Sequence, residues 1–360
     1  MKNIHRILIG IILLLIILGT VLIFSTKGFS FFISHIEKVL IAVVLFFISV
    51  TIPYKSYKKI SKIALMLIVL MLLLTLFIGP EVKGASRWLN LGIIRFQPSE
   101  FAKIFLLLHL AVLIEEKGKE NIKSFNHGLV FTLIWIFAVC GLIFLQPNVS
   151  TAIIIAFTSF ILLYVGGARL SHLLGIGGSI FVFAIGLGAM VMPHAKARIL
   201  PYIKSFLTEG YINFQVLQSK IALGSGGLLG LGIGKSRQSD LFLPESHNDF
   251  IFSVIGEELG FFGAMVILVA YMAIFIVGLF IAKRTKDEFG QLLAFSISFT
   301  IVLSAFIHVA IGLGLLPTTG ITLPFISFGG TSIIIFSISI GILINISLAN
   351  NKKLKTRKAQ

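Results

Sequence analysis

The stretch from Ile7 to Phe24 reads ILIGIILLLIILGTVLIF and contains no charged residue. As an α-helix it would be about 27 Å long, close to the thickness of the hydrocarbon core of a bilayer. Lys2 and Arg6 precede it, and no convincing small-residue cleavage site follows it. We therefore interpret the stretch as a membrane-spanning helix and not as a cleaved signal peptide.

Further apolar runs of comparable length follow along the chain. With the first run they predict an all-α polytopic membrane protein of about ten transmembrane helices. The composition agrees, because 57% of the residues are hydrophobic and only 12% are charged, as is typical of lipid-facing helices. We treat 1–360 as one transmembrane domain, with 193–249 as a long extracytoplasmic loop between helices seven and eight. The later runs lie near 37–53, 62–79, 98–114, 127–145, 150–167, 173–192, 250–282, 291–313 and 325–348.

The formal net charge of +16 comes largely from basic residues that flank the apolar runs. They form no basic face with an aromatic stacking platform, so the sequence does not indicate nucleic-acid binding. With ten spans both termini lie on one side of the membrane, and 18 of the 30 Lys and Arg residues lie in segments on that side. The positive-inside rule therefore predicts that both termini are cytoplasmic.

Four of the predicted outward segments are rich in glycine, proline and ionisable residues, unlike ordinary short linkers between membrane helices. We expect the chemistry of the protein to lie in these four segments. In chain order they are GASRWLN (84–90) with FQPSEFAK (96–103), QPNVST (146–151), GSGGLLGLG (224–232) with LPESHNDFIF (243–252), and LPTTG (316–320) with LPFISFGGTS (323–332).

Asp249 is the outward carboxylate that we single out. The chain has three aspartates, and Asp287 belongs to a predicted cytoplasmic loop, which leaves two outside. Asp249 directly precedes the apolar run 250–282 and has Glu245 and His247 close in sequence. Partial desolvation and a nearby like charge both favour proton uptake by a carboxylate, as a general base requires. The alternative is a helix N-cap, because an aspartate before a helix caps its free amide groups.

In their order and spacing, the four segments resemble those of the FtsW/RodA/SpoVE (SEDS) family of cell-wall polymerases. The resemblance covers nearly the whole chain, and Ser236-Arg237-Gln238 and Thr318-Thr319 are more similar to the division (FtsW) branch than to the elongation branch. It implies a peptidoglycan glycosyltransferase that polymerises lipid II, an undecaprenyl-pyrophosphate-linked disaccharide-peptide, at the outer face of the bacterial cytoplasmic membrane. It further implies that Asp249 is the essential aspartate of the long outer loop.

The resemblance implies an inverting transfer in which Asp249 removes the proton of an acceptor sugar hydroxyl while pyrophosphate leaves the donor. The leaving pyrophosphate needs cations, for which arginine offers bidentate contacts and lysine a point charge. The candidate substrate-binding residues are Arg87, Trp88, Gln97, Glu100, Lys103, Asn148, Lys220, Glu245, His247 and Ser332.

Several of these residues have a second interpretation. Arg87 suits phosphate binding and anchoring at lipid headgroups equally well, whereas anchoring is preferred for Lys196 and Arg198. Glu100 and Lys103 stand three residues apart, so on a helix they can pair directly. Such a pair near the membrane fits a substrate site and a structural clamp almost equally well.

Two segments depart from simple motifs. Asn148 stands where the family usually has aspartate, so an acidic role there is in doubt, although an amide retains hydrogen bonding and helix capping. The glycine run 224–232 lacks the Lys-Ser/Thr ending of a P-loop. Its glycines instead fit close backbone approach to a substrate or to a neighbouring helix. No cofactor is certain, and a divalent cation, Mg or Mn, between pyrophosphate and Asp249 stays open.

Two other functions stay open at this level. Ten spans, with breaks at Pro147 and Pro324, also describe a lipid II flippase, but the acidic residues lie at helix ends and in loops, which favours chemistry at the membrane surface. A non-catalytic scaffold of a cell-wall complex is the third function. The resemblance also implies a class B penicillin-binding transpeptidase as partner, with other division or elongation proteins.

Overall fold

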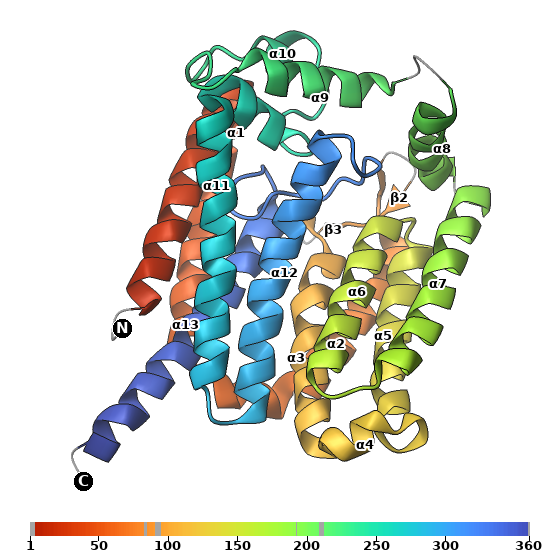
Figure 1. Cartoon of the computed structure of the whole chain (residues 1–360), viewed down its shortest axis with the longest axis vertical. Helices are drawn as coiled ribbons and strands as arrows, with labels where there is room; N and C mark the ends of the chain where they lie inside the picture. Colours follow the sequence, from red (N-terminus) through yellow and green to blue (C-terminus); the bar gives the residue numbers. More distant parts are fainter. Residues whose placement is uncertain (1–3, 83–84, 91–94, 192, 209–211, 359–360) are drawn as a thin grey trace.

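The computed structural model describes the chain except for residues 1–3, 83–84, 91–94, 192, 209–211 and 359–360. The described residues form a bundle of long helices with shorter helices at both ends (Figure 1). The long helices are α1 (Ile4–Thr51), α2 (Tyr54–Ile78), α3 (Pro98–Lys117), α5 (Val130–Leu145), α6 (Val149–Val165), α7 (Leu170–Val191), α11 (Ile251–Arg284), α12 (Glu288–Gly312) and α13 (Gly330–Lys358).

The remaining elements are short. Two antiparallel hairpins lie between α2 and α3, with Glu81 opposite Ser86 in one and Leu89 opposite Phe96 in the other. The short elements are β1 (Glu81–Val82), β2 (Ala85–Ser86), β3 (Leu89–Asn90), β4 (Arg95–Phe96), α4 (Lys119–Lys123), the π-helical turn η1 (Phe125–Leu129), α8 (Pro193–Leu207), α9 (Phe214–Ser225) and α10 (Arg237–Leu241).

Among the described residues, six helices are long and apolar enough to span a membrane, and Val149–Val165 is a shorter apolar helix. The fold is therefore all-α and polytopic, as predicted. The helix α1 contains two predicted spans, 7–24 and 37–53, separated at Gly28 with a φ of 73°. Glycine adopts such a positive φ without the steric cost that other residues have. In Figure 1 the first half of α1 rises from the N-terminus and the second half returns to the end where α2 begins. The total of ten spans stays a prediction.

The segment 193–249, predicted as the long extracytoplasmic loop, contains the helices α8, α9 and α10. Figure 1 shows α9 and α10 lying across one end of the bundle, with α8 near the same end of α7. Asn213 caps α9 by accepting a hydrogen bond from the Gln215 amide at 3.0 Å, and Ser236 caps α10 through the Ser239 amide at 3.1 Å. Capping side chains thus supply helix starts that a search for long apolar runs does not find.

The glycine run packs against the bent start of α11. The amides of Leu231 and Gly232 donate to the carbonyls of Glu257 and Glu258 at 2.9 and 3.0 Å. A Cβ atom on Gly230 would lie 2.2 Å from the Glu258 carbonyl oxygen, so a side chain is excluded there. Close approach of the backbone to a neighbouring helix therefore explains why residue 230 is glycine. This was one of the two interpretations given from the sequence.

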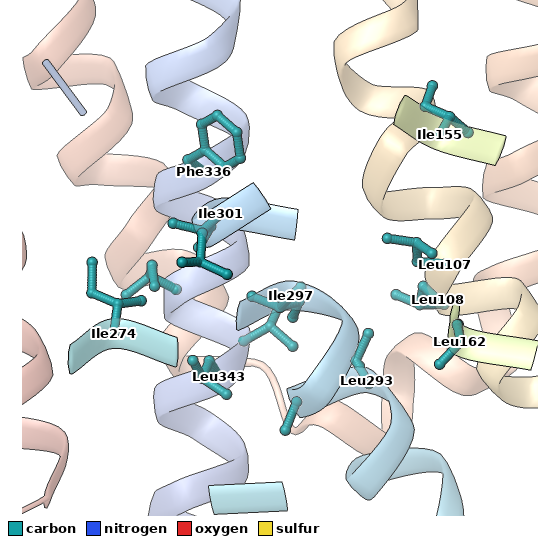
Figure 2. Close-up of a cluster of buried hydrophobic side chains, with 14 of the residues drawn as sticks. Leu107, Leu108, Ile155, Leu162, Ile274, Leu293, Ile297, Ile301, Phe336 and Leu343 are labelled. Carbon is teal, nitrogen blue, oxygen red and sulfur yellow. The ribbon is translucent and has the colours of Figure 1, made fainter. Parts of the chain in front are cut away.

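The core lies around α12, which packs against α11, α13, α3 and α6 (Figure 2). Branched and aromatic side chains fill the space between these helices. This packing positions the ends of α3, α11 and α13 where the motif segments lie. The labelled core residues are Leu107 and Leu108 of α3, Ile155 and Leu162 of α6, Ile274 of α11, Leu293, Ile297 and Ile301 of α12, and Phe336 and Leu343 of α13.

Candidate active site

Asp249 lies in a tight turn at the start of α11. The amides of Asn248 and Asp249 both donate to the Glu245 carbonyl at 3.0 Å. Glu245 adopts a φ of 56°, in the left-handed region that costs a non-glycine residue free energy. The helix begins at Ile251 with Phe250 at the capping position and no side-chain cap. Asp249 is thus half-buried and one residue outside the N-cap position, which does not support the capping alternative.

Segments that are far apart in the sequence meet beside the Asp249 carboxylate. A Cβ atom on Gly320 would lie 3.7 Å from Asp249 Oδ2 and 3.8 Å from both terminal nitrogens of Arg198. The Asp249 carboxylate and the Arg198 guanidinium therefore lie against the same glycine. Arg198 Nη1 also donates to the Thr319 carbonyl at 2.7 Å. This bond holds α8 against the segment before α13.

Arg87 completes this cluster from the segment between β2 and β3. Its Nη2 donates to the Pro147 carbonyl, which joins the first motif to the second. Burial and the charge of Arg198 lower the pKa of Arg87, the charge of Asp249 raises it, and together they bring that pKa to about 10. Arg87 stays protonated at neutral pH, since this pKa is well above 7. We call Asp249, Arg87 and Arg198 the outer cluster, which has two cations for one carboxylate.

A cavity of about 220 Å³ adjoins the outer cluster. Its walls come from α8, α9 and the segment after α12, and Arg198 belongs to both the cavity and the outer cluster. Lys220 also lines it, with Nζ 3.3 Å from the position of a Cβ on Gly314. Lys220 is exposed and Arg198 half-buried. The arrangement presents two cations to one hollow, which suits an anionic ligand.

The role preferred for Arg198 from the sequence, anchoring at lipid headgroups, does not match its position. Its guanidinium lies against Gly320 beside Asp249, and it is bonded to Thr319. Sequence reasoning could not place it there, because α8 is more than 40 residues from Asp249 along the chain. The exposed Lys196 retains the anchoring interpretation.

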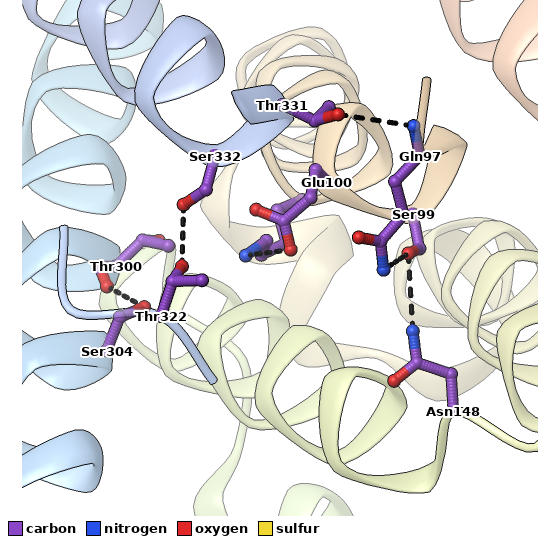
Figure 3. Close-up of polar contacts among 10 residues, drawn as sticks. Gln97, Ser99, Glu100, Asn148, Thr300, Ser304, Thr322, Thr331 and Ser332 are labelled. Carbon is purple, nitrogen blue, oxygen red and sulfur yellow. Dashed lines mark hydrogen bonds and ion pairs between the residues drawn. The ribbon is translucent and has the colours of Figure 1, made fainter. Parts of the chain in front are cut away.

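Five other candidate residues share a buried polar network where α3 and α13 begin (Figure 3). Glu100 and Lys103 form the predicted ion pair at 2.8 Å, with side chains that are 11% and 8% exposed. The Gln97 amide contacts Thr331 Oγ1 at 3.4 Å. Two further bonds extend the network: Asn148 Nδ2 donates to Ser99 Oγ at 3.3 Å, and Thr322 Oγ1 and Ser332 Oγ are 2.7 Å apart.

This buried network joins the first, second and fourth motifs. Asn148 takes part as a hydrogen-bond donor to Ser99, so the amide found here has a function in packing. It stands at the capping position of α6 but makes no side-chain cap bond. Substrate contact by Gln97, Glu100, Lys103, Asn148 and Ser332 stays a prediction.

Glu245 and His247 lie in the Asp249 turn, and Trp88 follows Arg87 of the outer cluster in sequence. His247 Nε2 is 4.0 Å from Glu245 Oε2, and the carbonyl of His247 accepts a bond from the Phe328 amide at 3.0 Å. Ser327 Oγ donates to the Asn248 carbonyl at 2.9 Å. The third and fourth motifs are thus joined mainly through backbone atoms. Trp88 is half-buried next to Arg87, and its carbonyl oxygen lies against Gly79.

The described residues offer little to hold a metal ion. Within this part of the chain, no group of three or more His, Cys, Asp or Glu side chains is arranged to bind one. A divalent cation near Asp249 would therefore need most of its ligands from a bound diphosphate. The donor set does not fit a metal site built by the protein alone.

A comparison with models of protein families identifies the family of this chain. The model of the FtsW/RodA/SpoVE family, described as "Cell cycle protein", matches residues 4–352. The chain belongs to this FtsW/RodA/SpoVE family. The suspected resemblance is therefore confirmed, and the protein is a multi-pass membrane protein of a family with members in peptidoglycan synthesis.

Curated relatives agree with the family assignment. Stage V sporulation protein E of Bacillus subtilis is 33% identical over 357 residues, covering 94% of this chain and 96% of the relative. The probable peptidoglycan glycosyltransferase FtsW of Trichlorobacter lovleyi is 39% identical over 274 residues, covering 75% of this chain and 70% of the relative.

Solved structures share the fold. A chain from a structure described as "Structural coordination of polymerization and crosslinking by a peptidoglycan synthase complex" aligns with a TM-score of 0.80 at 23% identity, covering 95% of this chain and 97% of that chain. The rod shape determining protein RodA of Thermus thermophilus aligns with a TM-score of 0.73 at 25% identity, covering 95% and 96%. At these identities the likeness supports the fold of this FtsW/RodA/SpoVE member.

Proposed function

We propose that this protein is a glycosyltransferase that polymerises lipid II into glycan strands at the outer face of the bacterial cytoplasmic membrane. The observation that carries the proposal is the outer cluster, in which a half-buried carboxylate meets two guanidinium groups. A general base and cations for a leaving diphosphate are the two requirements of this transfer. The names of the relatives, probable peptidoglycan glycosyltransferases, support the same reaction class.

In the proposed reaction, an acceptor sugar hydroxyl attacks the anomeric carbon of a lipid-linked donor sugar. The new glycosidic bond forms as the bond from the anomeric carbon to the diphosphate oxygen breaks, with inversion at that carbon. The hydroxyl proton moves to Asp249, and the bonding electrons leave with the diphosphate. A positioned base of this kind contributes about two to four decades of rate.

Arg87 and Arg198 are the groups that we assign to the leaving diphosphate. Arginine can donate two parallel hydrogen bonds to phosphate oxygens. We assign the diphosphate to the cavity that Arg198 and Lys220 line. The turn at Glu245 and its bonds to the fourth motif would hold Asp249 in position while the substrates exchange.

The cellular context is part of the proposal. We assign the protein to the cytoplasmic membrane with both termini inside and the outer cluster outside. A class B penicillin-binding transpeptidase is the proposed partner, by analogy with the peptidoglycan synthase complex that shares the fold. Septal synthesis is the proposed setting, because several of the relatives are named FtsW.

The test is polymerisation of fluorescent lipid II by the purified protein together with its transpeptidase partner. The proposal predicts a ladder of glycan strands that a muramidase digests. A preparation that moves fluorescent lipid II across vesicle membranes but forms no polymer would contradict the proposal and favour a flippase. A preparation that does neither, while its partner crosslinks added glycan strands, would favour a scaffold.

A further inference from the structure

A second cavity lies at the end of the bundle opposite Asp249, where α4 packs beside α6, α11 and α12. It has a volume of about 340 Å³, in the range of small-molecule sites. Its charged lining consists of Lys119 from α4, Lys283 from α11 and Glu288 from α12. Apolar residues, including Val165 and Phe295, complete it. None of these residues has a part in the proposed polymerisation.

The carboxylate of Glu288 is incompletely satisfied in this cavity. Its Oε1 is buried and accepts no hydrogen bond from the described residues. Lys119 Nζ lies 3.9 Å from that oxygen, whereas a direct charge-assisted bond would be about 2.7–2.9 Å long. Lys119 is 63% exposed and Lys283 is also exposed. The cavity therefore offers two exposed cations together with a carboxylate that can accept another hydrogen bond.

An aromatic surface leads from this cavity along the helices. Phe295 stacks on Phe299 with ring centroids 5.6 Å apart, and Phe299 lies 6.4 Å from Phe157 of α6. Phe275 of α11 lies 6.1 Å from Phe299. We call these four rings the aromatic track. Phe157 is 47% exposed and the other rings are half-buried, so the track faces the outside of the bundle.

Counted from the end of the bundle where the cavity lies, α11 and α12 both carry a charged residue first and aromatic residues next. On α12, Glu288, Phe295 and Phe299 are spaced to share one face, and on α11, Phe275 and Lys283 are two turns apart on one face. Each helix thus presents charge at its end and aromatic rings further in. A ligand that matches this surface has a charged head and an apolar tail.

We propose that this cavity and the aromatic track bind an aminophospholipid, with phosphatidylethanolamine as the chemical type. The phosphate contacts Lys119 and Lys283, the ammonium donates to Glu288 Oε1, and an acyl chain lies along the aromatic track. A purely anionic lipid would use the two lysines but would place negative charge beside Glu288. The carboxylate therefore selects a zwitterionic headgroup over an anionic one.

Native mass spectrometry of the purified full-length protein, titrated with dioleoyl-phosphatidylethanolamine or dioleoyl-phosphatidylglycerol, tests the proposal. Wild type is expected to prefer the ethanolamine lipid. Glu288→Gln should weaken binding of that lipid by about tenfold and leave the glycerol lipid unaffected, as expected for loss of one charge-assisted bond. The double variant Lys119→Met/Lys283→Met should weaken both lipids by at least about tenfold.

Two control variants come from the same end of the bundle. Glu120→Gln removes an exposed carboxylate paired with Lys123 at 2.7 Å, and Lys117→Met removes an ammonium that lies 4.2 Å from the ring centroid of Phe131. Neither residue lines the cavity, so both variants should bind both lipids as wild type does. Size-exclusion chromatography and thermal unfolding establish that all variants are folded.

Three outcomes would overturn the proposal. The first is an unchanged preference between the two lipids in Glu288→Gln. The second is equal competition by glycerophosphoethanolamine, which would mean that a soluble headgroup suffices and the aromatic track takes no part. The third concerns wild type, so it does not depend on any variant folding: a phosphatidylethanolamine with a photoreactive acyl chain should label peptides containing Phe295 and Phe299, and labelling spread evenly over the bundle would contradict the assigned site.

Discussion

The outer cluster and the buried network both pair a carboxylate with basic side chains, yet they differ in net charge and in exposure to solvent. In the buried network Glu100 and Lys103 form a one-to-one pair at 2.8 Å with almost no exposed surface. In the outer cluster two guanidinium groups accompany one carboxylate, beside a cavity of about 220 Å³. The first arrangement is neutral within itself, whereas the second keeps positive charge for an anionic ligand. We infer that the buried network stabilises the fold and that the outer cluster performs the chemistry.

The largest expected effect on stability comes from breaking the buried pair. Glu100→Gln leaves the Lys103 ammonium buried without its carboxylate, which typically costs about 3–5 kcal/mol. We expect a lower free energy of unfolding, measured as thermal unfolding in detergent, with near-normal polymerisation by the protein that remains folded.

The double variant Glu100→Gln/Lys103→Met is the control, because removal of both charges should recover much of the lost stability. Abolished polymerisation at unchanged stability would reverse the comparison. It would place Glu100 in the substrate site, which is one of the two interpretations that the sequence left open.

Arg198 should matter more to catalysis than to stability. Arg198→Met removes a cation beside Asp249, and loss of a hydrogen bond to a charged group corresponds to about 1.5–3 kcal/mol, or roughly tenfold to a hundredfold in kcat/KM. Lys196→Met, on the same helix with an exposed side chain, is the matched control. Equal losses in both variants would mean that α8 acts only through its general positive charge.

Gly320 should be sensitive to a single methyl group. Its φ of +78° costs an alanine about 1–2 kcal/mol, and the new Cβ would contact both Asp249 and Arg198. Gly320→Ala should lower the rate of polymerisation by about tenfold. Gly178→Ala, which has open space around its position, should keep normal activity. A fully active Gly320→Ala enzyme would show that this contact does not organise the outer cluster.

The smallest expected effect belongs to Lys220. Because its side chain is exposed, solvent screening should limit its contribution to about 0.2–1 kcal/mol. Lys220→Met should raise KM a few-fold at low salt and less at high salt, since ions screen exposed charges. Kinetics at two ionic strengths measure this difference. A loss that persists at high salt would indicate that Lys220 is buried against the substrate during turnover.

The two regions also differ in how far the sequence predicted them. Glu100 and Lys103 stand three residues apart on a helix, so helical geometry alone predicted their pairing. Asp249 was identified by the resemblance to the FtsW/RodA/SpoVE family together with its position before an apolar run. The meeting of Asp249 with Arg198 and Gly320 could not be predicted from local pattern, because it depends on how α8 folds against the segment before α13.

The fold likewise has parts that the sequence predicted and parts that it did not. Long apolar runs predicted the polytopic bundle, since a bilayer requires them. The helices α8, α9 and α10 were treated as loop, because short polar helices depend on caps such as Asn213 and Ser236 and on tertiary packing. The buried Glu257 was also missed. Its carboxylate accepts a bond from the Arg237 amide at 3.0 Å and supports the start of α10.

The most direct test of the account is polymerisation of lipid II by Asp249→Asn, compared with wild type at matched folding and with the same transpeptidase partner. The substitution keeps the size of the side chain and removes its ability to take up a proton. We predict a rate lower by about two to four decades, with unchanged thermal unfolding and unchanged binding of lipid II. Polymerisation within a few-fold of wild type would contradict it and remove Asp249 from the mechanism.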